Sequence, residues 1–400
     1  MSAMKRLFQV MADKKASDIF MSVGAPINIK INGVAVPVNQ AIMTSDTIRQ
    51  LLYEILTERQ IKEFEDEMEL NTALALEGVG SFRISAFRQK GAPAVVVRYI
   101  PSSIPVIDSL GVPEVLKEVI MQKRGLILMV GATGSGKSTS LASMIDYRNE
   151  RKSGHILTLE DPVEFIFQNK KSIINQREVG TDTTAFEIAL KNALRQAPDC
   201  ILIGEIRDKQ TMAMALAYAQ SGHLCLATLH ANNSYHAMNR IINFYPLETR
   251  PSLLLDLAAA LQAVISQRLV RTKSGARVAA VEVLLNTRNI SELIEKGEIS
   301  EIKEALEKSL APGSQTFEQA LFKLFMEGKI TQDEAMANAD SATNMLWLIN
   351  QATAGELSLS GGSTSVPVSP IEPPAEDEKK GVLAAGTGAS FNDFKIDMNA

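Results

Sequence analysis

One run of residues combines glycines with a lysine and hydroxyl side chains. It reads Gly131, Ala132, Thr133, Gly134, Ser135, Gly136, Lys137, Ser138 and Thr139, and it lies between an apolar run and a helical pattern. In phosphate-binding loops of this pattern, the glycines let backbone N–H groups converge on the phosphates. The lysine reaches the β and γ phosphates, and the following hydroxyl ligates Mg²⁺. An ordinary glycine-rich turn is the alternative, but the flanking elements favour a nucleotide site that uses Lys137 and Ser138.

Acidic side chains follow two apolar runs of the same region. His155–Leu159 is followed by Glu160-Asp161-Pro162-Val163-Glu164, and Cys200–Ile203 by Gly204-Glu205. Hydrolysis of a nucleotide needs an acid for Mg²⁺ and a group that orients or deprotonates water, both at strand ends bordering one crevice. Solvated strand-end acids or helix caps are the alternative. Four acids at two such ends favour a position facing the phosphate loop.

Two histidines, His223 and His230, lie on either side of the apolar run Leu224–Thr228. A histidine at the far end of a strand can donate a hydrogen bond to a γ-phosphate or to a neighbouring acid, which makes His230 a candidate. The alternative is a histidine satisfied in the core or at the surface. Adding Cys225 and His236 produces no recognised zinc spacing, so we expect no metal site of that kind here.

The first hundred residues predict a small α+β unit. Apolar residues alternate from Ile27 to Val38 around Asn32-Gly33, which predicts a hairpin with its apolar side chains on one face. Helical spacing from Ile48 to Leu56 follows the cap candidates Thr44 and Ser45, and strands are expected at Phe82–Phe87 and Ala94–Ile100. Residues 101–105 read as a linker, so the first domain is predicted at 1–105.

Short apolar runs then alternate with helical segments, which is typical of an α/β domain with a largely parallel sheet. The expected strands are Leu126–Val130, His155–Leu159, Cys200–Ile203 and Leu224–Thr228. Later segments are predicted to be helical, with capping boxes at Thr316 and Thr331 and helix ends at Gly297 and Gly328. This domain, with its C-terminal helical subdomain, is predicted at 106–350. Residues 351–400 are rich in Gly, Ser, Pro and charge, which predicts a disordered tail.

Composition narrows the classes of function. The chain of 400 residues is 46% hydrophobic and 22% charged, as in folded multidomain proteins. A net charge of -5 offers no basic surplus for nucleic acid. The two cysteines, Cys200 and Cys225, cannot form a disulfide framework or a four-thiolate zinc site, which favours a reduced, cytosolic setting. No apolar run is long enough to span a bilayer, and the N-terminus reads as an amphipathic helix.

Four motifs together resemble one known family. They are GATGSGKST (131–139), EDPVEF (160–165), LRQAPDCILIGEIRD (194–208) and SGHLCLATLH (221–230). This set resembles the type IV pilus retraction ATPases, PilT and PilU, over residues 1 to about 350. SLASMIDYRN (140–149), HANNSYHAMNRIINFYP (230–246) and EVLLNT (282–287) look more like PilU, and residues 288–294 keep only part of the PilT motif AIRNLIR.

The resemblance implies a fold and a set of roles. It implies a PAS-like N-terminal α+β domain, a RecA-like P-loop ATPase domain and a hexameric ring that binds ATP and Mg²⁺ between subunits. Glu164 matches the water-activating base, and Glu205 matches the acid that helps Ser138 to hold Mg²⁺, partly through water. His223 and His230 match the family's histidine box. Arg83 and Arg98 match N-terminal arginines that approach the phosphates; an exposed strand face paired to acids is the alternative.

The function implied is a hexameric ATP-hydrolysing motor for pilus retraction and twitching motility. It would lie in the cytoplasm at the inner membrane, under the pilus platform protein, and act on the pilin filament indirectly. It would work with a second, PilT-like ATPase and bind no nucleic acid. An extension ATPase is disfavoured, because those enzymes carry a further N-terminal domain and a tetracysteine zinc element. No acceptor site or basic groove indicates a P-loop kinase or a nucleic-acid motor. An ATP-binding structural module of the retraction complex, without motor output, stays open.

Overall fold

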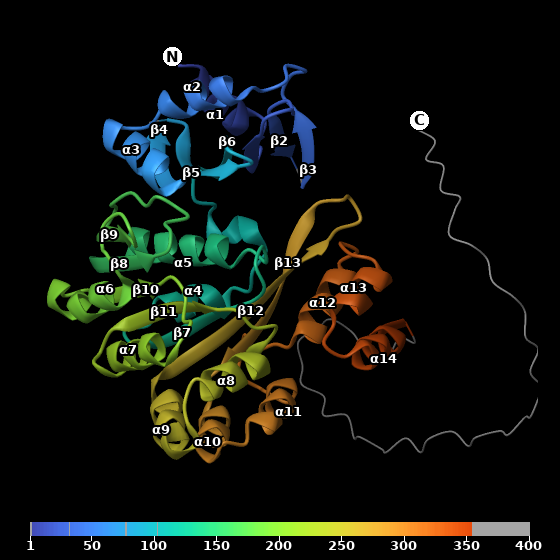
Figure 1. Ribbon diagram of the computed structural model, residues 1–400. Helices are drawn as coiled ribbons and strands as arrows, with labels where there is room; N and C mark the ends of the chain where they lie inside the picture. The colour runs from blue at the N-terminus through green and yellow to red at the C-terminus, as the bar shows by residue number, and fades with distance from the viewer. Residues whose placement is uncertain (1, 32, 77, 102, 354–400) are drawn as a thin grey trace, which may run out of the picture. The chain divides into compact units, whose positions relative to one another are not determined.

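The computed structural model describes residues 2–31, 33–76, 78–101 and 103–353. Within these residues the chain forms a six-stranded and a seven-stranded sheet, which confirms the mixed α/β class (Figure 1). The last described helix, α14 (Ala342–Thr353), extends three residues past the boundary expected at 350. The rest of the tail predicted at 351–400 lies outside the described residues.

The first sheet is antiparallel and has the order β3-β2-β1-β6-β5-β4. Its strands are β1 (Asp18–Met21), β2 (Asn28–Ile31), β3 (Val34–Pro37), β4 (Glu69–Leu76), β5 (Gly80–Gln89) and β6 (Ala92–Pro101). Ile31 pairs with Val34 and Ile29 with Val36, so the predicted hairpin and its register are confirmed. The sequence also predicted β5 and β6, but not the short β1 or β4.

Three helices cover the apolar side chains of this sheet: α1 (Ala3–Asp13), α2 (Ser45–Tyr53) and α3 (Glu58–Glu67). Phe8 of α1 stacks on Phe82 of β5 with ring centroids 4.1 Å apart, in a core that also contains Ile48 and Val97. Thr44 caps α2 by accepting a hydrogen bond from the Thr47 amide, as its position before the helical pattern predicted.

The second sheet has the order β13-β12-β7-β11-β10-β8-β9 and is parallel except for β13. Its strands are β7 (Gly125–Val130), β8 (Gly154–Glu160), β9 (Ser172–Glu178), β10 (Cys200–Ile203), β11 (Leu224–Leu229), β12 (Leu261–Arg271) and β13 (Arg277–Leu285). The four predicted strands are confirmed as β7, β8, β10 and β11.

The sequence correctly predicted helices in the region after β11, but it missed the two strands β12 and β13. Helix α9 (Arg250–Ala260) passes directly into strand β12, which pairs with β7 on one side and β13 on the other. Most residues of β12 are buried, and its apolar residues do not alternate regularly with its polar ones. Periodicity does not distinguish such a buried strand from a buried helix, and the apolar run of α9 immediately before it hides the boundary.

Helices pack on both faces of the second sheet, where two separate apolar cores form. The helices are α4 (Val115–Ile120), α5 (Lys137–Arg151), α6 (Phe186–Ala193), α7 (Lys209–Gln220), α8 (Ser234–Asn243), α9, α10 (Arg288–Lys296) and α11 (Ile302–Glu307), with short 3₁₀ turns at Ile107–Leu110, Leu194–Gln196, Leu247–Thr249 and Ile299–Glu301. Gly297 ends α10 in the left-handed region, as predicted.

The C-terminal helices form a separate small core beside β12 and β13 (Figure 1). They are α12 (Phe317–Met326), α13 (Gln332–Asn338) and α14. The capping box at Thr316 is confirmed, with Gln319 as its partner. Thr331 also caps its helix, but the Glu334 carboxylate accepts from the Arg271 amide at 2.8 Å, so α13 is fastened to β12.

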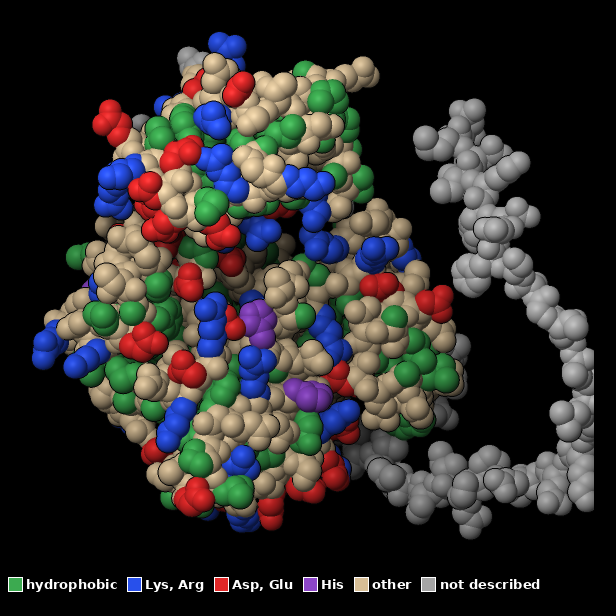
Figure 2. Space-filling model, viewed as in Figure 1, with side chains coloured by type: hydrophobic (Ala, Val, Ile, Leu, Met, Phe, Trp, Pro, Cys, Tyr) green, Lys and Arg blue, Asp and Glu red, His purple; other side chains and the backbone are tan. Residues whose placement is uncertain are grey.

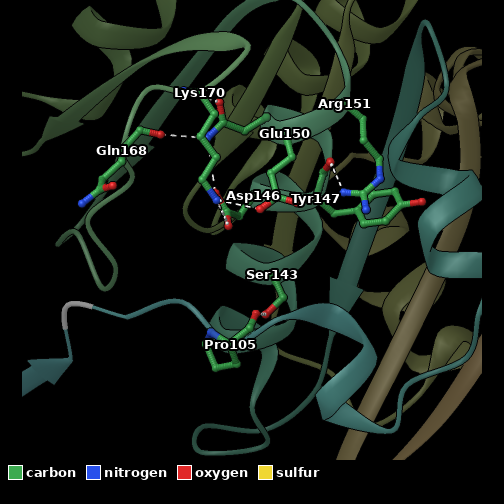
Figure 3. A network of polar contacts seen from close by, with 9 residues as sticks. Pro105, Ser143, Asp146, Tyr147, Glu150, Arg151, Gln168 and Lys170 are labelled. Carbon is green, nitrogen blue, oxygen red and sulfur yellow. Dashed lines mark hydrogen bonds and ion pairs between the residues drawn. The ribbon is translucent and has the colours of Figure 1, made fainter.

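Helix α5 is held in place by contacts along its length. Lys170 donates to Asp146 at 2.7 Å and to Glu150 at 2.9 Å, and Arg151 stacks on the Tyr147 ring of the same helix (Figure 3). Ser143 donates to the carbonyl of Pro105 at 2.7 Å, where the predicted linker ends. These contacts hold the helix that follows the glycine-rich loop, and therefore the loop itself, in a defined position.

Candidate functional site

The glycine-rich loop 131–136 connects buried β7 to the first turn of α5. Gly131 and Gly136 have φ angles of +153° and +87°. A Cβ on Gly131 would lie 2.5 Å from Ser135 Oγ, and one on Gly136 would lie 2.6 Å from Gln267 Nε2. Side chains are therefore excluded at both positions, and the backbone can approach a ligand closely.

Lys137 is almost fully buried, at 8% exposure. Its Nζ donates to the carbonyl oxygens of Gly131 at 2.7 Å and Ala132 at 2.8 Å, so the lysine spans the loop. Burial lowers its pKa, and the negative charges of Glu164 and Glu205 act in the opposite direction. Both predicted acids therefore lie close enough to interact with Lys137, although they come from separate strand ends.

The loop is supported from behind by Gln267 of β12, which the sequence analysis missed. Its Nε2 donates to the carbonyl of Ser135 at 2.9 Å, and its Oε1 accepts from Ser140 Oγ at 2.7 Å. Gln267 is 2% exposed, but its neighbours Ser266 and Arg268 are polar too, so no local pattern of the sequence distinguished it.

The loop that follows β8 carries Glu164. Two side chains of β9 hold its backbone: Glu178 accepts from the Val163 amide at 3.0 Å, and Gln176 bonds both the Phe167 amide and the Phe165 carbonyl. Buried Glu160 accepts from the Glu164 amide at 3.4 Å. Burial raises the pKa of Glu160, although a hydrogen bond from Thr158 opposes that shift.

Both carboxylate oxygens of Glu205 have a basic side chain beside them. Arg207 Nε donates to Oε2 at 2.8 Å, and His230 Nε2 lies 3.5 Å from Oε1. Arg207 also reaches Asp161 at 3.5 Å, so it connects the acids at the ends of β8 and β10. Sequence reasoning missed Arg207, although a base two residues after a strand-end acid was a visible signal.

The two histidines lie at opposite ends of strand β11. Strand β11 is parallel to β7, so His230, just after β11, lies at the edge where the glycine-rich loop begins. His223 precedes β11, and at roughly 3.3 Å per residue it is about 20 Å away. Its Nδ1 is 3.0 Å from Ser221 Oγ and 3.2 Å from the Tyr218 carbonyl. Of the pair, His230 is the histidine close to the acids.

Arg83 and Arg98 lie on adjacent strands, as predicted, and face each other across β5 and β6, but they have different partners. Arg83 Nη2 lies 3.5 Å from the carbonyl of Val163, and the charges of Glu164 and Glu178 partly offset the fall in its pKa that burial causes. It lines a cavity of about 400 Å³. Arg98 donates to Asp18 at 3.0 Å instead.

A nucleotide fits the residues of the loop. The glycines carry no side chains that would cover the backbone of the loop, and buried Ser135 Oγ has no hydrogen-bond partner within the described part of the chain. A cavity of about 250 Å³ borders the loop and is also lined by Arg268 and Arg277. For Mg²⁺, Ser138 and Glu205 supply oxygen atoms, the ligand type that this ion prefers.

The segment after His230 is fastened to β13 by buried Glu282. Its Oε1 accepts from the Ser234 amide at 2.7 Å and from Ser266 Oγ at 3.0 Å. Burial raises the pKa of this carboxyl group, and the negative charge of Asp340 raises it further. The folded protein therefore binds a proton here more tightly than the unfolded chain does, and ionisation costs stability as the pH rises.

We expect the substitution Glu282→Gln to stabilise the protein relative to wild type as the pH rises from 4 to 8. The amide oxygen retains both acceptor contacts, while the buried charge is removed. About 1 kcal/mol corresponds to roughly 2–4 °C in Tm for a domain of this size. Thermal unfolding at several pH values measures the difference, and a Tm difference that does not change with pH would contradict the shifted carboxyl group.

Comparisons with known proteins agree with this geometry. The Type II/IV secretion system protein family matches residues 2–337. The type IV pilus ATPase PilU of Pseudomonas aeruginosa is 46% identical over 346 residues, which cover 86% of this chain and 91% of that protein. The chain belongs to the PilT/PilU family of type IV pilus retraction ATPases.

Further members of the family support this assignment. The type IV pilus retractation ATPase PilT of P. aeruginosa is 39% identical over 83% of this chain and 97% of its own. A crystal structure of the pilus retraction motor PilT with bound ADP has a TM-score of 0.80 at 37% identity, over 87% of this chain and 99% of that one. The predicted ATPase class and the greater similarity to PilU than to PilT are confirmed. Within the described residues, no helix combines the length and apolar character needed to cross a membrane.

Proposed function

We propose that the chain is an ATP-hydrolysing motor that drives retraction of type IV pili, and with it twitching motility. The observation that carries this proposal is that the parallel strands β7, β8 and β10 end at the same side of the sheet, which places Glu164 and Glu205 where their charges act on Lys137 of the glycine-rich loop. Family membership connects this site with pilus retraction, since PilT relatives are named for it. We further propose that residues 1–105 form a PAS-like domain and residues 106–350 a RecA-like domain that assembles into hexamers.

The roles of the residues follow from their positions. Lys137 exchanges its bonds to the loop carbonyls for bonds to the β and γ phosphates, and the loop amides stabilise the same negative charge. Bound Mg²⁺, held by Ser138 and Glu205, would neutralise charge on the phosphates. Glu164 accepts a proton from the attacking water. Contacts with Glu160 of β8 and Glu178 of β9 hold its loop, and so keep the carboxylate in place for this step. His230 orients Glu205 and donates toward the γ-phosphate.

Arg83 connects the N-terminal sheet with the site. Its guanidinium group already faces the loop of Glu164 and the charge of Glu178. A γ-phosphate would add negative charge at this place and favour closure, and loss of phosphate after hydrolysis would remove that attraction. We propose this cycle as the step that converts hydrolysis into domain motion.

Arg83→Ala is expected to lower kcat by roughly 10- to 100-fold, as loss of a hydrogen bond to a charged group does. Arg98→Ala serves as the matched control, because it removes the cross-strand arginine that binds Asp18. We expect it to change stability more than turnover. Steady-state ATPase assays compare the variants, and an equal fall of kcat in both would argue against the assignment of Arg83.

The distribution of charged side chains on the surface supports a protein partner over nucleic acid. Figure 2 shows Lys, Arg, Asp and Glu side chains mixed over the visible face, without a continuous basic groove. We propose that the hexamer binds the pilus platform protein at the cytoplasmic face of the inner membrane, acts on the filament indirectly, and works with a second, PilT-like ATPase.

Retraction of pili in living cells tests this function. Cells that lack this chain, a second retraction ATPase or both are compared for retraction under load. We expect deletion of this chain to reduce retraction, and re-expression of the wild type to restore it. Purified protein that does not hydrolyse ATP, alone or with the second ATPase, would refute the motor.

A structural module without motor output is the second candidate, since the same motifs bind ATP in either case. The two differ in their need for hydrolysis. If Glu164→Gln supports normal retraction under load, the chain acts as a structural module; if retraction fails while the protein is still present in the complex, it acts as a motor.

A further inference from the structure

The segment between His230 and α8 is held by residues that are distant in the sequence. Arg240 of α8 donates to the carbonyl of His230 at 2.7 Å, and Arg268 of β12 donates to the carbonyl of Asn232 at 3.1 Å. Asn233 caps α8 by accepting from the His236 amide at 2.9 Å. The backbone that carries His230 is therefore fixed by side chains rather than by a sheet.

Asp340 joins two of these groups. One carboxylate oxygen accepts from Arg268, and the other accepts from Asn233 Nδ2 at 2.6 Å. The Asp340 side chain is 15% exposed, so water screens these contacts little. Asp340 precedes α14 and therefore belongs to the C-terminal helices rather than to the sheet that carries the site.

The C-terminal helices hold Asp340 rigidly. The adjacent Ser341 amide donates to buried Glu318 of α12 at 2.8 Å. The Arg268 guanidinium group lies 3.9 Å from the centre of the Phe317 ring and also bonds the carbonyl of Asn338. Movement of these helices would therefore move Asp340 and Arg268, the two side chains that contact Asn233 and Asn232.

Arg268 comes directly after Gln267 in the sequence, and Gln267 supports the glycine-rich loop. Gln267 contacts Ser135 and Ser140, while the next side chain along β12 reaches Asn232 and Asp340. Successive side chains of a strand point to opposite faces. One short stretch of β12 thus contacts the glycine-rich loop on one face and the C-terminal helices on the other.

We propose that Asp340 is a positioning residue for His230, through which helices α12–α14 maintain the contact between His230 and Glu205. The inference rests on the proposed function, because His230 matters only where Glu205 acts on a nucleotide. Asp340 acts through Arg268 and Asn233 and does not touch the nucleotide site itself. Its removal loosens residues 231–233 and the first turn of α8, because Asn233, whose Oδ1 caps that helix, loses the contact that holds its side chain.

Hydrogen–deuterium exchange combined with ATPase kinetics tests the proposal on the full-length protein. In Asp340→Ala we expect amides of residues 231–237 to exchange about tenfold faster, as loss of a charged hydrogen bond predicts. We also expect kcat to fall at least about threefold while KM for ATP stays within about twofold, because positioning and not binding is lost.

Glu334→Ala is the matched control. Glu334 also connects the C-terminal helices to β12, through the Arg271 amide, but it does not contact the His230 segment. It should leave both exchange of 231–237 and kcat near the wild-type values. If Asp340→Ala does not fold, Asp340→Asn replaces it; this variant keeps one acceptor oxygen and should give smaller changes of the same sign.

The outcomes separate the two proposals. Equal exchange of 231–237 in the Asp340 and Glu334 variants overturns the positioning role, and faster exchange with unchanged kcat overturns its importance for hydrolysis. Absence of ATP turnover in the wild type refutes the motor, while the exchange comparison still decides whether Asp340 holds the segment.

Discussion

Replacing Glu164 with glutamine is expected to lower kcat for ATP by about 10²- to 10⁴-fold, the usual contribution of a general base, with little change in nucleotide affinity. The substitution keeps the size of the side chain. It also leaves the support of the loop intact, because Glu160 and Glu178 bind backbone amides and not the Glu164 carboxylate. Only the proton acceptor is lost.

Steady-state ATPase assays and calorimetric titration with a non-hydrolysable ATP analogue measure the two quantities. Glu150→Gln is the control, since Glu150 is also an acid with a basic partner, Lys170, but lies on the exposed side of α5. Its kcat should match the wild type. Turnover above about a tenth of the wild-type rate in Glu164→Gln would assign the base to another residue, since a general base contributes at least about 10²-fold.

Lys137→Ala is expected to weaken nucleotide binding by at least about 30-fold, because truncating one partner of a buried, hydrogen-bonded charge pair costs about 2–5 kcal/mol or more. Lys137 is buried, and its Nζ already lies on the carbonyl side of the loop, where it can turn toward a phosphate. Alanine removes this charge but leaves the glycine backbone in place.

Titration calorimetry with ADP and with ATP measures this loss, and Lys170→Ala is the control. Lys170 pairs with two acids, Asp146 and Glu150 (Figure 3), which lie in the second half of α5, whereas Lys137 lies in its first turn. We expect its affinities to match those of the wild type. ADP binding that Lys137→Ala leaves unchanged would place the phosphates elsewhere on the chain.

Much of the fold was predictable where the signal is local. The hairpin of β2 and β3, the cap at Thr44 and the strand before the glycine-rich loop depend on neighbouring residues, and all were predicted correctly. β12 was not, because a strand buried between two neighbours lacks the polar alternation that marks an exposed sheet.

The candidate site likewise has a part that the sequence predicted and a part that it did not. The loop 131–139 needs a strand, tight glycine turns and a helix in immediate succession, so its geometry is encoded within a few residues. The strand-end acids were also visible, because parallel strands place their C-terminal ends at one edge. The sequence by itself therefore determined the glycine-rich loop between a strand and a helix and which acids lie at the same end of the sheet.

Only the tertiary structure decided which partners these residues have. Arg83 reaches the acidic loop whereas Arg98 binds Asp18, and His230 rather than His223 lies near Glu205. Gln267 supports the loop from a strand more than a hundred residues away. Such contacts depend on strand order, on register and on which face of a strand a side chain occupies. These properties arise when the whole chain packs, and no short stretch of sequence contains them.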